Sequence, residues 1–568
     1  MQPSDRKALV VVVRRIGSLA SEVVTGGIAT ARVAARVGVL APMRPDRMVG
    51  MVRGLRAWGN TAAGLYAAGA ARHPDRAAVI DERETVSFAE IDRRSSIVAA
   101  ALGALGIGEG DAVALLARNS SAFVVATVAI TKLGANILYL NTGFAGPQLG
   151  DVLESEKAAA IIADDEFTEL VEKHAHGLPH LVAWVEKGKP PERSIPGLIE
   201  AAEGTATPSL PRPENETKHV ILTSGTTGRP KGASRGAPSG LAAAVSGIAF
   251  LDAIPYRGQG VTVLAAPAFH AWGLGNLTVG MMLGSTFVMT RRFDPKETLQ
   301  LVEKHKADTI AAVPVMCQRM LDVEGDFDTS SLRIVALSGS ALAPTLATRF
   351  MDRFGDVLYS LYGSTEVAYV SVAGPEDLRA APSTQGRVLR GVTVRLVDEN
   401  DEDVPDGEIG RIFAGSSMSF EGYTSGEDKA RLGNLASIGD VGRIGEDGRL
   451  YVEGRDDDMI VSGGENVFPA EVEETLHQHK AVSDVAVVGV EDEKFGQALV
   501  AHVVLRSGAS ASADDLRKHV KAHLANYKVP REIVFHDSLP RNETGKVLKR
   551  ELREDKDEKD EKDEKEDG

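Results

Sequence analysis

Short apolar runs alternate with helical stretches along most of this chain, and no other feature constrains its fold as strongly. Helical patterns over residues 91–105 and 122–133 end close to glycines. A short apolar run is what a strand buried on both faces requires. Such runs lie at residues 112–116, 159–163, 219–222, 261–265, 309–313 and 334–337. The alternation is typical of α/β architecture with largely parallel sheets.

The pattern changes near Val392, where apolar and polar side chains begin to alternate. Several such stretches, separated by turn residues, predict a small antiparallel β unit. Three aspartates at 456–458 then form a polar connector, and a compact α/β pattern follows. We therefore expect a large N-terminal domain of parallel-type sheets plus a small β unit, and a small mobile C-terminal α/β domain. The predicted divisions are 56–454 for the large domain, 455–457 for the hinge and 458–552 for the small domain.

The two ends of the chain differ from its body. Residues 1–55 are basic and carry apolar residues at helical spacing between Ile16 and Ala31, which predicts an amphipathic N-terminal extension. Such a segment could make a peripheral contact with an anionic membrane, or it could pack on the body. Residues 553–568 are nearly all charged and are predicted to be a disordered tail.

Charge and cysteine content exclude some classes of protein. The chain has 568 residues and a formal net charge of -16, which argues against general nucleic-acid binding. Its single cysteine, Cys317, rules out an intrachain disulfide and fits a reducing, cytoplasmic location. No Cys/His cluster of the kind that holds a metal is present in the sequence. No oligomeric state is predicted.

A loop rich in glycine and threonine follows the apolar run at 219–222. Residues 222–232 contain three glycines, four hydroxyl side chains and two cations, groups that can converge on phosphate oxygens. The loop is not the common nucleotide loop, because Pro230 precedes Lys231 and Gly232 follows it. A polar surface turn is the alternative interpretation.

Four later segments carry chemistry of the same kind. Tyr362 could stack on a base and Glu366 could bind Mg²⁺. Asp440 could accept both hydroxyls of a ribose, with Arg455 near it. The turn at 462–469 contains two glycines, and Lys546 follows Thr-Gly in a loop close to the C-terminus. Taken alone, each segment could be an ordinary turn or a surface side chain.

Together, these five motifs resemble in order and spacing those of the adenylate-forming superfamily, which includes acyl-CoA synthetases. The resemblance runs from about residue 56 to 552. It implies that ATP and a carboxylate give an acyl-adenylate and pyrophosphate. The small domain then rotates, and a thiol, usually that of CoA, attacks the adenylate. The implied cofactors are ATP, Mg²⁺ and CoA.

The resemblance also implies roles for individual residues. Lys546 would bridge the carboxylate and the α-phosphate, Thr365 would contact the α-phosphate, and Glu366 would bind Mg²⁺. Asp457 would be the hinge pivot, and Gly463 and Gly464 would flank the path of CoA. The implied ATP and AMP contacts are Thr223, Ser224, Gly225, Thr226, Thr227, Gly228, Lys231, Gly339, Ser340, Ala341, Tyr362, Gly363, Ser364, Thr365, Asp440 and Arg455.

The acid is predicted from fewer residues. Gly363 stands where acetate-type members have a Trp, so a larger acyl pocket is expected. His270 of this pocket is a catalytic candidate that could adjust to the carboxylate or the thiol, and Trp272 could gate the pocket. The apolar residues at 277–283 would line the pocket or belong to the core. Little charge lies near these segments, which favours a medium- or long-chain fatty acid. The alternatives are an aryl acid, transfer of the acyl group to a carrier protein, and a non-enzymatic role as a membrane-associated lipid-binding protein. Local packing is the alternative for His270 and Trp272.

Overall fold

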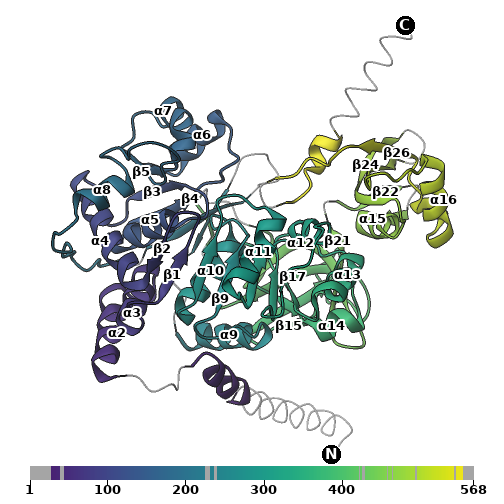
Figure 1. The fold of residues 1–568 in the computed structure, drawn as a ribbon. Coiled ribbons are helices and arrows are strands. Elements are labelled where there is room, and N and C mark those ends of the chain that lie inside the picture. Colours follow the sequence, from purple (N-terminus) through teal and green to yellow (C-terminus); the bar gives the residue numbers. More distant parts are fainter. Residues whose placement is uncertain are drawn as a thin grey trace, which may run out of the picture.

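The computed structural model describes most of the chain, and four β-sheets organise this part (Figure 1). Three sheets belong to the large N-terminal domain and one to the small C-terminal domain, which confirms the predicted α/β class. The described residues are 27–38, 44–215, 217–223, 231–235, 240–420, 422–424, 429–456, 458–462, 465–492, 496–542 and 545–553.

The nine-stranded sheet is mostly parallel. Its order is β15-β14-β13-β12-β11-β9-β10-β1-β2, and the strands from β13 to β1 in this order all run parallel. Their carboxyl ends therefore share one edge of the sheet. The strands are β1 (Ala77–Ile80), β2 (Thr85–Ser87), β9 (Val261–Leu264), β10 (Thr286–Met289), β11 (Thr309–Ala312), β12 (Ile334–Leu337), β13 (Leu358–Tyr362), β14 (Ser371–Ala373) and β15 (Arg387–Val388).

The seven-stranded sheet has the order β18-β8-β7-β4-β3-β5-β6. The strands from β7 to β6 are parallel, whereas β8 and β18 pair antiparallel. The strands are β3 (Ala112–Leu116), β4 (Asn136–Tyr139), β5 (Ala158–Ala163), β6 (His180–Val182), β7 (His219–Thr223), β8 (Lys231–Arg235) and β18 (Gly422–Tyr423).

The largest apolar core includes residues from both of these sheets and from the helices α3 (Ala62–Arg72), α4 (Phe88–Ala104), α5 (Ser121–Lys132) and α10 (Ala271–Leu283). Helices α4 and α5 begin where Ser87 and Ser120 accept a backbone N–H bond as N-caps. The other helices of the large domain are α2 (Pro45–Trp58), α6 (Gly146–Ser155), α7 (Thr168–His174), α8 (Ile195–Ala201), α9 (Gly240–Ala253), α11 (Pro295–His305), α12 (Pro314–Leu321), α13 (Pro344–Phe354) and α14 (Pro375–Ala380).

Helix α2 corrects one predicted boundary. The division placed at residue 55 falls inside α2, which packs against α3. Of the predicted amphipathic extension, the structure describes a helix at residues 27–36 and the start of α2. Most of the apolar stripe from Ile16 lies outside the described residues, as does the tail at 554–568. In the part of the chain that is described, no helix has the length and apolarity to span a bilayer.

The predicted antiparallel β unit is present. It forms a five-stranded sheet in which β16, β17, β20 and β19 follow one another and β21 pairs with β20. The strands are β16 (Val392–Val397), β17 (Gly410–Ser416), β19 (Arg431–Leu432), β20 (Leu435–Ile444) and β21 (Leu450–Arg455).

The small domain has its own sheet and core. It meets the large domain where α15 (Pro469–His477) lies against α13. Its elements are β22 (Ile460–Ser462), β23 (Glu465–Val467), α15 (Pro469–His477), β24 (Val482–Asp492), β25 (Gly496–Leu505), α16 (Ala513–His523) and β26 (Glu532–His536).

Candidate active site

The segments that follow three neighbouring strands form one side of the candidate site. The parallel strands β11, β12 and β13 end side by side, so the segments that follow them meet at one edge of the sheet. Gly339 follows β12 with φ +93°, a conformation that glycine adopts without strain. A Cβ on Gly339 would lie 3.5 Å from Val313 Cγ1, just beyond β11. Ser340, which is half-buried, and Ala341, which is exposed, continue this loop.

Tyr362, Asp440 and Arg455 come together from two different sheets. The Tyr362 hydroxyl donates to Asp440 Oδ2 at 2.6 Å, and Arg455 Nη1 lies 3.2 Å from Asp440 Oδ1. Burial raises the pKa of Asp440, although Tyr362 and Arg455 both act to lower it. Burial and the Asp440 carboxylate raise the pKa of Tyr362 well above its usual value, so its hydroxyl remains a donor. The structure thus joins two motifs that are 78 residues apart.

Glu366 is a buried carboxylate, 5% exposed, with cationic and hydroxyl partners. Lys429 Nζ lies 3.2 Å from its Oε1, and the Tyr423 hydroxyl donates to the same oxygen. Burial acts to raise the pKa of Glu366, but Lys429, Tyr423 and Ser364 outweigh it and the pKa is lowered. Glu366 is therefore ionised at neutral pH.

This environment fits Mg²⁺ as a partner of Glu366. The carboxylate is ionised and is a hard oxygen ligand, the kind that Mg²⁺ prefers. Among the described residues, no group of three or more His, Cys, Asp or Glu could hold a metal ion. Mg²⁺ at Glu366 would accordingly take its remaining ligands from phosphate oxygens and water.

The base of the glycine- and threonine-rich loop lies close to Glu366. Thr223 ends β7, Lys231 begins β8, and Ser224, Gly225, Thr226, Thr227 and Gly228 lie outside the described residues. Strand β18 pairs with β8, and Thr424 N donates to Gly232 O at 2.9 Å. Tyr423 of β18 is also the hydroxyl donor to Glu366. The same short strand therefore links the base of the loop to the carboxylate.

The loop that carries Lys546 reaches from the small domain to the large one. Gly545 is buried, and a Cβ there would lie 2.3 Å from Val315 Cγ1 at the start of α12. Val313, which lies beside Gly339, is the next neighbour at 3.6 Å. The side chain of Lys546 is exposed, and its backbone N–H donates to Asn542 Oδ1 at 2.9 Å.

His270 and Trp272 stand at the start of α10. The Nε2 atom of His270 is buried and has no hydrogen-bond partner in the described structure, and burial lowers the pKa of His270 to about 4. His270 is thus neutral at pH 7. Trp272 Nε1 donates to Ala312 O at 3.0 Å, which ties α10 to the end of β11.

Asn119 holds the segment before His270 and was missed in the sequence, because no motif surrounds it. It is 5% exposed. Its Nδ2 donates to Leu264 O at 3.1 Å and Ala266 O at 3.0 Å, and its Oδ1 accepts from Ala268 N at 2.7 Å. Lys429 and Tyr423 were missed for the same reason.

Close backbone packing explains why residue 363 is a glycine. A Cβ on this residue would lie 2.3 Å from Ala368 O, so any side chain would require the backbone to shift. The stretch after Trp272 also differs from the expected pocket lining, since Leu277 and Met281 are buried in the main core and Met282 is exposed. The acyl-pocket role of Gly363 remains a prediction.

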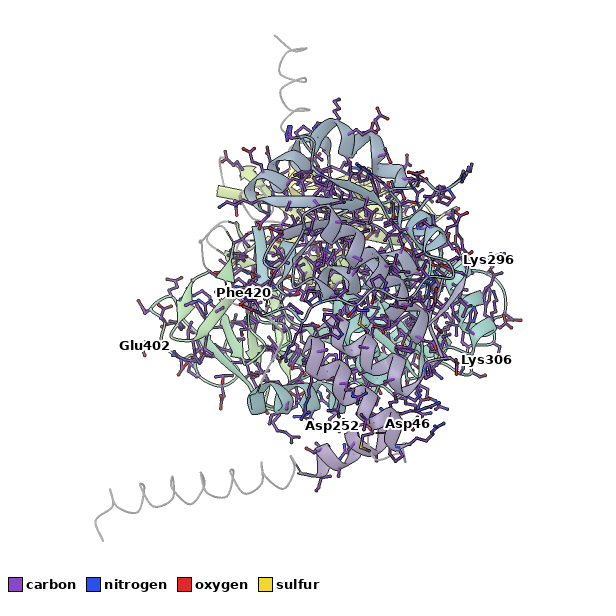
Figure 2. The ribbon with its side chains drawn as sticks, turned by 90° about the vertical axis from the view of Figure 1, so that its left-hand side faces the viewer. Asp46, Asp252, Lys296, Lys306, Glu402 and Phe420 are labelled. Carbon is purple, nitrogen blue, oxygen red and sulfur yellow. The ribbon has the colours of Figure 1, made fainter. Side chains whose placement is uncertain are left out.

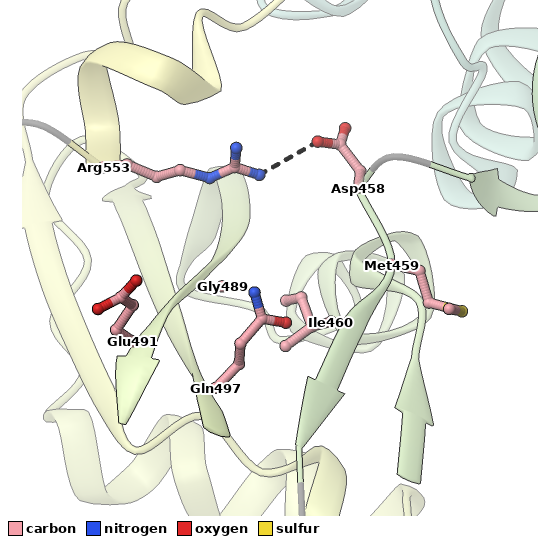
Figure 3. Close-up of a pocket in the computed structure, with 7 residues that line it drawn as sticks. All are labelled: Asp458, Met459, Ile460, Gly489, Glu491, Gln497 and Arg553. Atoms are coloured by element: carbon pink, nitrogen blue, oxygen red, sulfur yellow. Dashed lines mark hydrogen bonds and ion pairs between the residues drawn. The ribbon is translucent and has the colours of Figure 1, made fainter. Parts of the chain in front are cut away.

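The predicted hinge and the predicted CoA path are only partly described. Asp457, Gly463 and Gly464 lie outside the described residues. On one side of the hinge, Asp456 N donates to Gly439 O at 3.0 Å. On the other, Asp458 pairs with Arg553 at 3.2 Å across a cavity of about 190 Å³ in the small domain (Figure 3). The cavity is lined by Asp458, Met459, Ile460, Gly489, Glu491, Gln497 and Arg553.

The two-domain fold and this arrangement of residues are those of an adenylate-forming enzyme. The profile of the AMP-binding enzyme family matches residues 66–424, and that of the AMP-binding enzyme C-terminal domain matches residues 471–546. The chain belongs to the AMP-binding enzyme family, and the predicted resemblance is confirmed.

Individual relatives include ligases for different acids and acceptors. The chain is 31% identical to the indoleacetate–CoA ligase of Aromatoleum aromaticum, over 85% of this chain and 95% of the relative. It is 29% identical to the fatty acid–[acyl-carrier-protein] ligase ScoC of Streptomyces coeruleorubidus, over 85% of this chain and 94% of the relative. The chain also matches the structure of o-succinylbenzoate CoA synthetase from Bacillus subtilis in complex with its acyl-adenylate intermediate. The TM-score is 0.75 and the identity 27%, over 86% of this chain and 97% of the relative.

These relatives establish the class of reaction. Most are named as CoA ligases of aryl or other acids, so this chain is an adenylate-forming ligase of the CoA-ligase family. Enzymes of this class that form acyl-CoA use ATP, Mg²⁺ and CoA.

Proposed function

We propose that the chain activates a medium- or long-chain fatty acid with ATP and then transfers the acyl group to CoA. In the first step, a carboxylate oxygen attacks the α-phosphorus of ATP, and pyrophosphate leaves. In the second, the CoA thiol attacks the acyl carbon, and AMP leaves. The observation that carries the proposal is the contact between Tyr362, Asp440 and Arg455, with Glu366 in the neighbouring turn.

Each group in the first step has a defined task. Asp440 and Arg455 hold the ribose, and Tyr362 stacks on the base while its hydroxyl fixes Asp440. Thr365 and Lys546 contact the reacting phosphate and carboxylate. When bound at Glu366, Mg²⁺ supplies charge neutralisation to the phosphate oxygens. No general base is required, because a carboxylic acid is already ionised at neutral pH. Positioning and charge stabilisation therefore perform the catalysis.

An apolar environment supports the choice of acid. Trp272 packs against a buried apolar cluster, at the edge of which Arg36 donates to Leu251 O and Tyr256 O. Its members include Phe250, Ile254, Leu361 and Tyr369. An acid with a second charged group on its tail would gain no binding energy from such surroundings. Burial of each methylene of an alkyl tail, by contrast, contributes about 0.8 kcal/mol to binding.

An aryl acid is the second candidate for the substrate. Two observations favour it: the first relative named above is an indoleacetate–CoA ligase, and Phe250 stacks on both Tyr256 and Tyr369 at ring distances of 6.0 and 5.4 Å. An aromatic substrate could extend such a stack. A carrier protein is the alternative acceptor, since ScoC is named for that transfer.

We also propose a cytoplasmic location with a peripheral membrane contact through the N-terminal extension. The single cysteine is a buried thiol, which suits a reducing compartment. A fatty acid partitions into membranes, so an enzyme that uses it gains from residence at their surface.

One assay tests the proposed function. Pyrophosphate release is measured with ATP, Mg²⁺ and a panel of fatty and aryl acids, with and without CoA. The proposal predicts pyrophosphate with alkyl acids of medium or greater length and acyl-CoA when CoA is present. If only aryl acids are turned over, the substrate is an aryl acid and not a fatty acid. Release of pyrophosphate without formation of acyl-CoA would favour a carrier protein over CoA as the acceptor. If no acid gives pyrophosphate, the lipid-binding role is favoured.

A further inference from the structure

Helix α2 has one face that packs and one that does not. A Cβ added at Gly50 or Gly54 would lie 2.9–3.0 Å from the Cβ atoms of Ala71 and Ala67, so the glycine side of α2 lies close against α3. Met48, Val49 and Val52 lie on the opposite side of the helix, as its 3.6-residue period requires. They are 50%, 49% and 39% exposed. Large apolar side chains thus face outward from a helix that has no buried residue.

Positive charge surrounds this apolar face. Residues 44–58 contain four arginines and one acidic residue, Asp46, in a chain of net charge -16. Arg44 is exposed and pairs with Asp46. Arg53 and Arg56 are exposed and have no acidic partner among the residues that the structure describes. We name Arg44, Met48, Val49, Val52, Arg53 and Arg56 the α2 face.

A second exposed apolar residue lies at the same end of the molecule. Ile28, in the helix at residues 27–36, is 55% exposed. The two helices are joined through hydrogen bonds from Arg72 to Gly38 O and from Arg47 to Arg72 O, each 3.0 Å long. Figures 1 and 2 show both helices at the lower end of the molecule. Figure 2 labels Asp46 of α2 there, and also Asp252, the partner of Arg32.

We propose that the α2 face docks the enzyme on an anionic lipid bilayer. The arginines attract the negative surface, and the three apolar side chains enter the boundary between headgroups and acyl chains. The combination favours a bilayer over a second copy of this chain, because a symmetric contact between two copies would place Arg53 and Arg56 against the same arginines of the other copy. The inference rests on the proposed fatty-acid function, since it names the surface that brings the enzyme to an apolar substrate.

Vesicle co-sedimentation of the full chain tests the proposal. Wild-type protein is compared with the Met48→Ser/Val49→Ser/Val52→Ser and Arg53→Glu/Arg56→Glu variants on vesicles of phosphatidylcholine with phosphatidylglycerol, and on phosphatidylcholine alone. We expect wild-type binding to the anionic vesicles only, and partition weaker by about tenfold in each variant. Ile409→Ser is the matched control, since Ile409 is 48% exposed between β16 and β17, and it should bind like wild type.

Several outcomes would overturn the proposal. These are no sedimentation of the wild type, equal sedimentation of the apolar variant, or a loss in the Ile409→Ser control as large as in the variants. A dimer in solution that the apolar variant abolishes, without vesicle binding, would make the α2 face a self-association surface. Acyl-CoA synthesis from a soluble acid is measured in parallel. If it fails while the vesicle results hold, the proposed function falls and the docking surface stands.

Discussion

At the scale of single residues, the site depends on polar groups that hold one another in place. The Tyr362 hydroxyl on β13 fixes Asp440 on β20, and Arg455 on β21 approaches the other oxygen of the same carboxylate. A Cβ on Gly439, which has φ +80°, would lie 3.0 Å from the Arg455 guanidinium. Glycine therefore permits the turn and the close approach together.

Removal of the charge at Glu366 tests its role toward the metal. Glu366→Gln should raise the Mg²⁺ concentration needed for half-maximal pyrophosphate release by about tenfold or more, because a neutral amide is a weaker Mg²⁺ ligand. Titration of activity with Mg²⁺ measures the shift. Glu453→Gln is the control, since Glu453 pairs with Arg443 in a more exposed position. An unchanged Mg²⁺ requirement in Glu366→Gln would contradict the role.

The pH dependence of adenylation tests the state of His270. Burial lowers its pKa to about 4, below the usual value near 6.5, so the imidazole stays neutral from pH 5.5 to 8. We expect no change in kcat/KM near pH 6.5 that depends on this residue. The same shift predicts that His270 contributes stability above pH 6.5, and that this contribution is lost as the pH falls toward 4. A step near pH 6.5 that His270→Asn removes would contradict this.

Asn119→Ala should affect both stability and the site. It removes a buried side chain whose three hydrogen bonds hold residues 264–268, so the free energy of unfolding should fall by about 1–3 kcal/mol. The KM for the acid should rise, because the segment leads directly into His270. Asn136→Ala is the control, since Asn136 bonds to Gly110 and Lys218 away from the site. Equal effects on KM in the two variants would refute the positioning role.

At the scale of elements, six strands of the two largest sheets and the antiparallel β unit were predictable, whereas a strand that forms only through its partner was not. The apolar runs predicted strands β3, β5, β7, β9, β11 and β12 close to their observed bounds. Strand β8, Lys231–Arg235, is mostly polar and forms through pairing with β7, which no local pattern reveals. The end of the N-terminal extension was placed inside α2, because exposed apolar and charged residues there mask its packing on α3.

The hinge belongs to the same scale. Backbone hydrogen bonding ties Asp456 to Gly439 of the large domain, and an ion pair ties Asp458 to Arg553 of the small domain. Rotation about the intervening residue would leave both attachments intact and would break the 3.3 Å hydrogen bond from Asp458 N to Arg455 O, which spans that residue. Asp457→Pro restricts φ there and should reduce thioesterification far more than adenylation. Separate assays of pyrophosphate release and of CoA transfer from supplied acyl-AMP measure the two. Equal losses would rule out the pivot.

At the scale of the whole molecule, the order of motifs gave the class of enzyme and the two-domain plan. Contacts between distant segments could not be foreseen: Lys429 beside Glu366, Tyr423 between β8 and Glu366, and Asn119 bonded to Ala268. Each joins parts of the chain that only the assembled sheets bring together. The acid is the least predictable feature, because apolar residues at 277–283 serve the core as well as they would serve a pocket.

The central claim is that the two domains share one adenylation site, which Lys546 completes. The structure already packs Gly545 against Val315, next to Val313, which also lies beside Gly339. Lys546→Ala is therefore assayed for acyl-adenylate formation and, separately, for transfer of supplied acyl-AMP to CoA, with Lys549→Ala as control, since Lys549 pairs with Glu473. The account predicts adenylation slower by on the order of a hundredfold or more, with transfer largely retained. Normal adenylation by Lys546→Ala would contradict it.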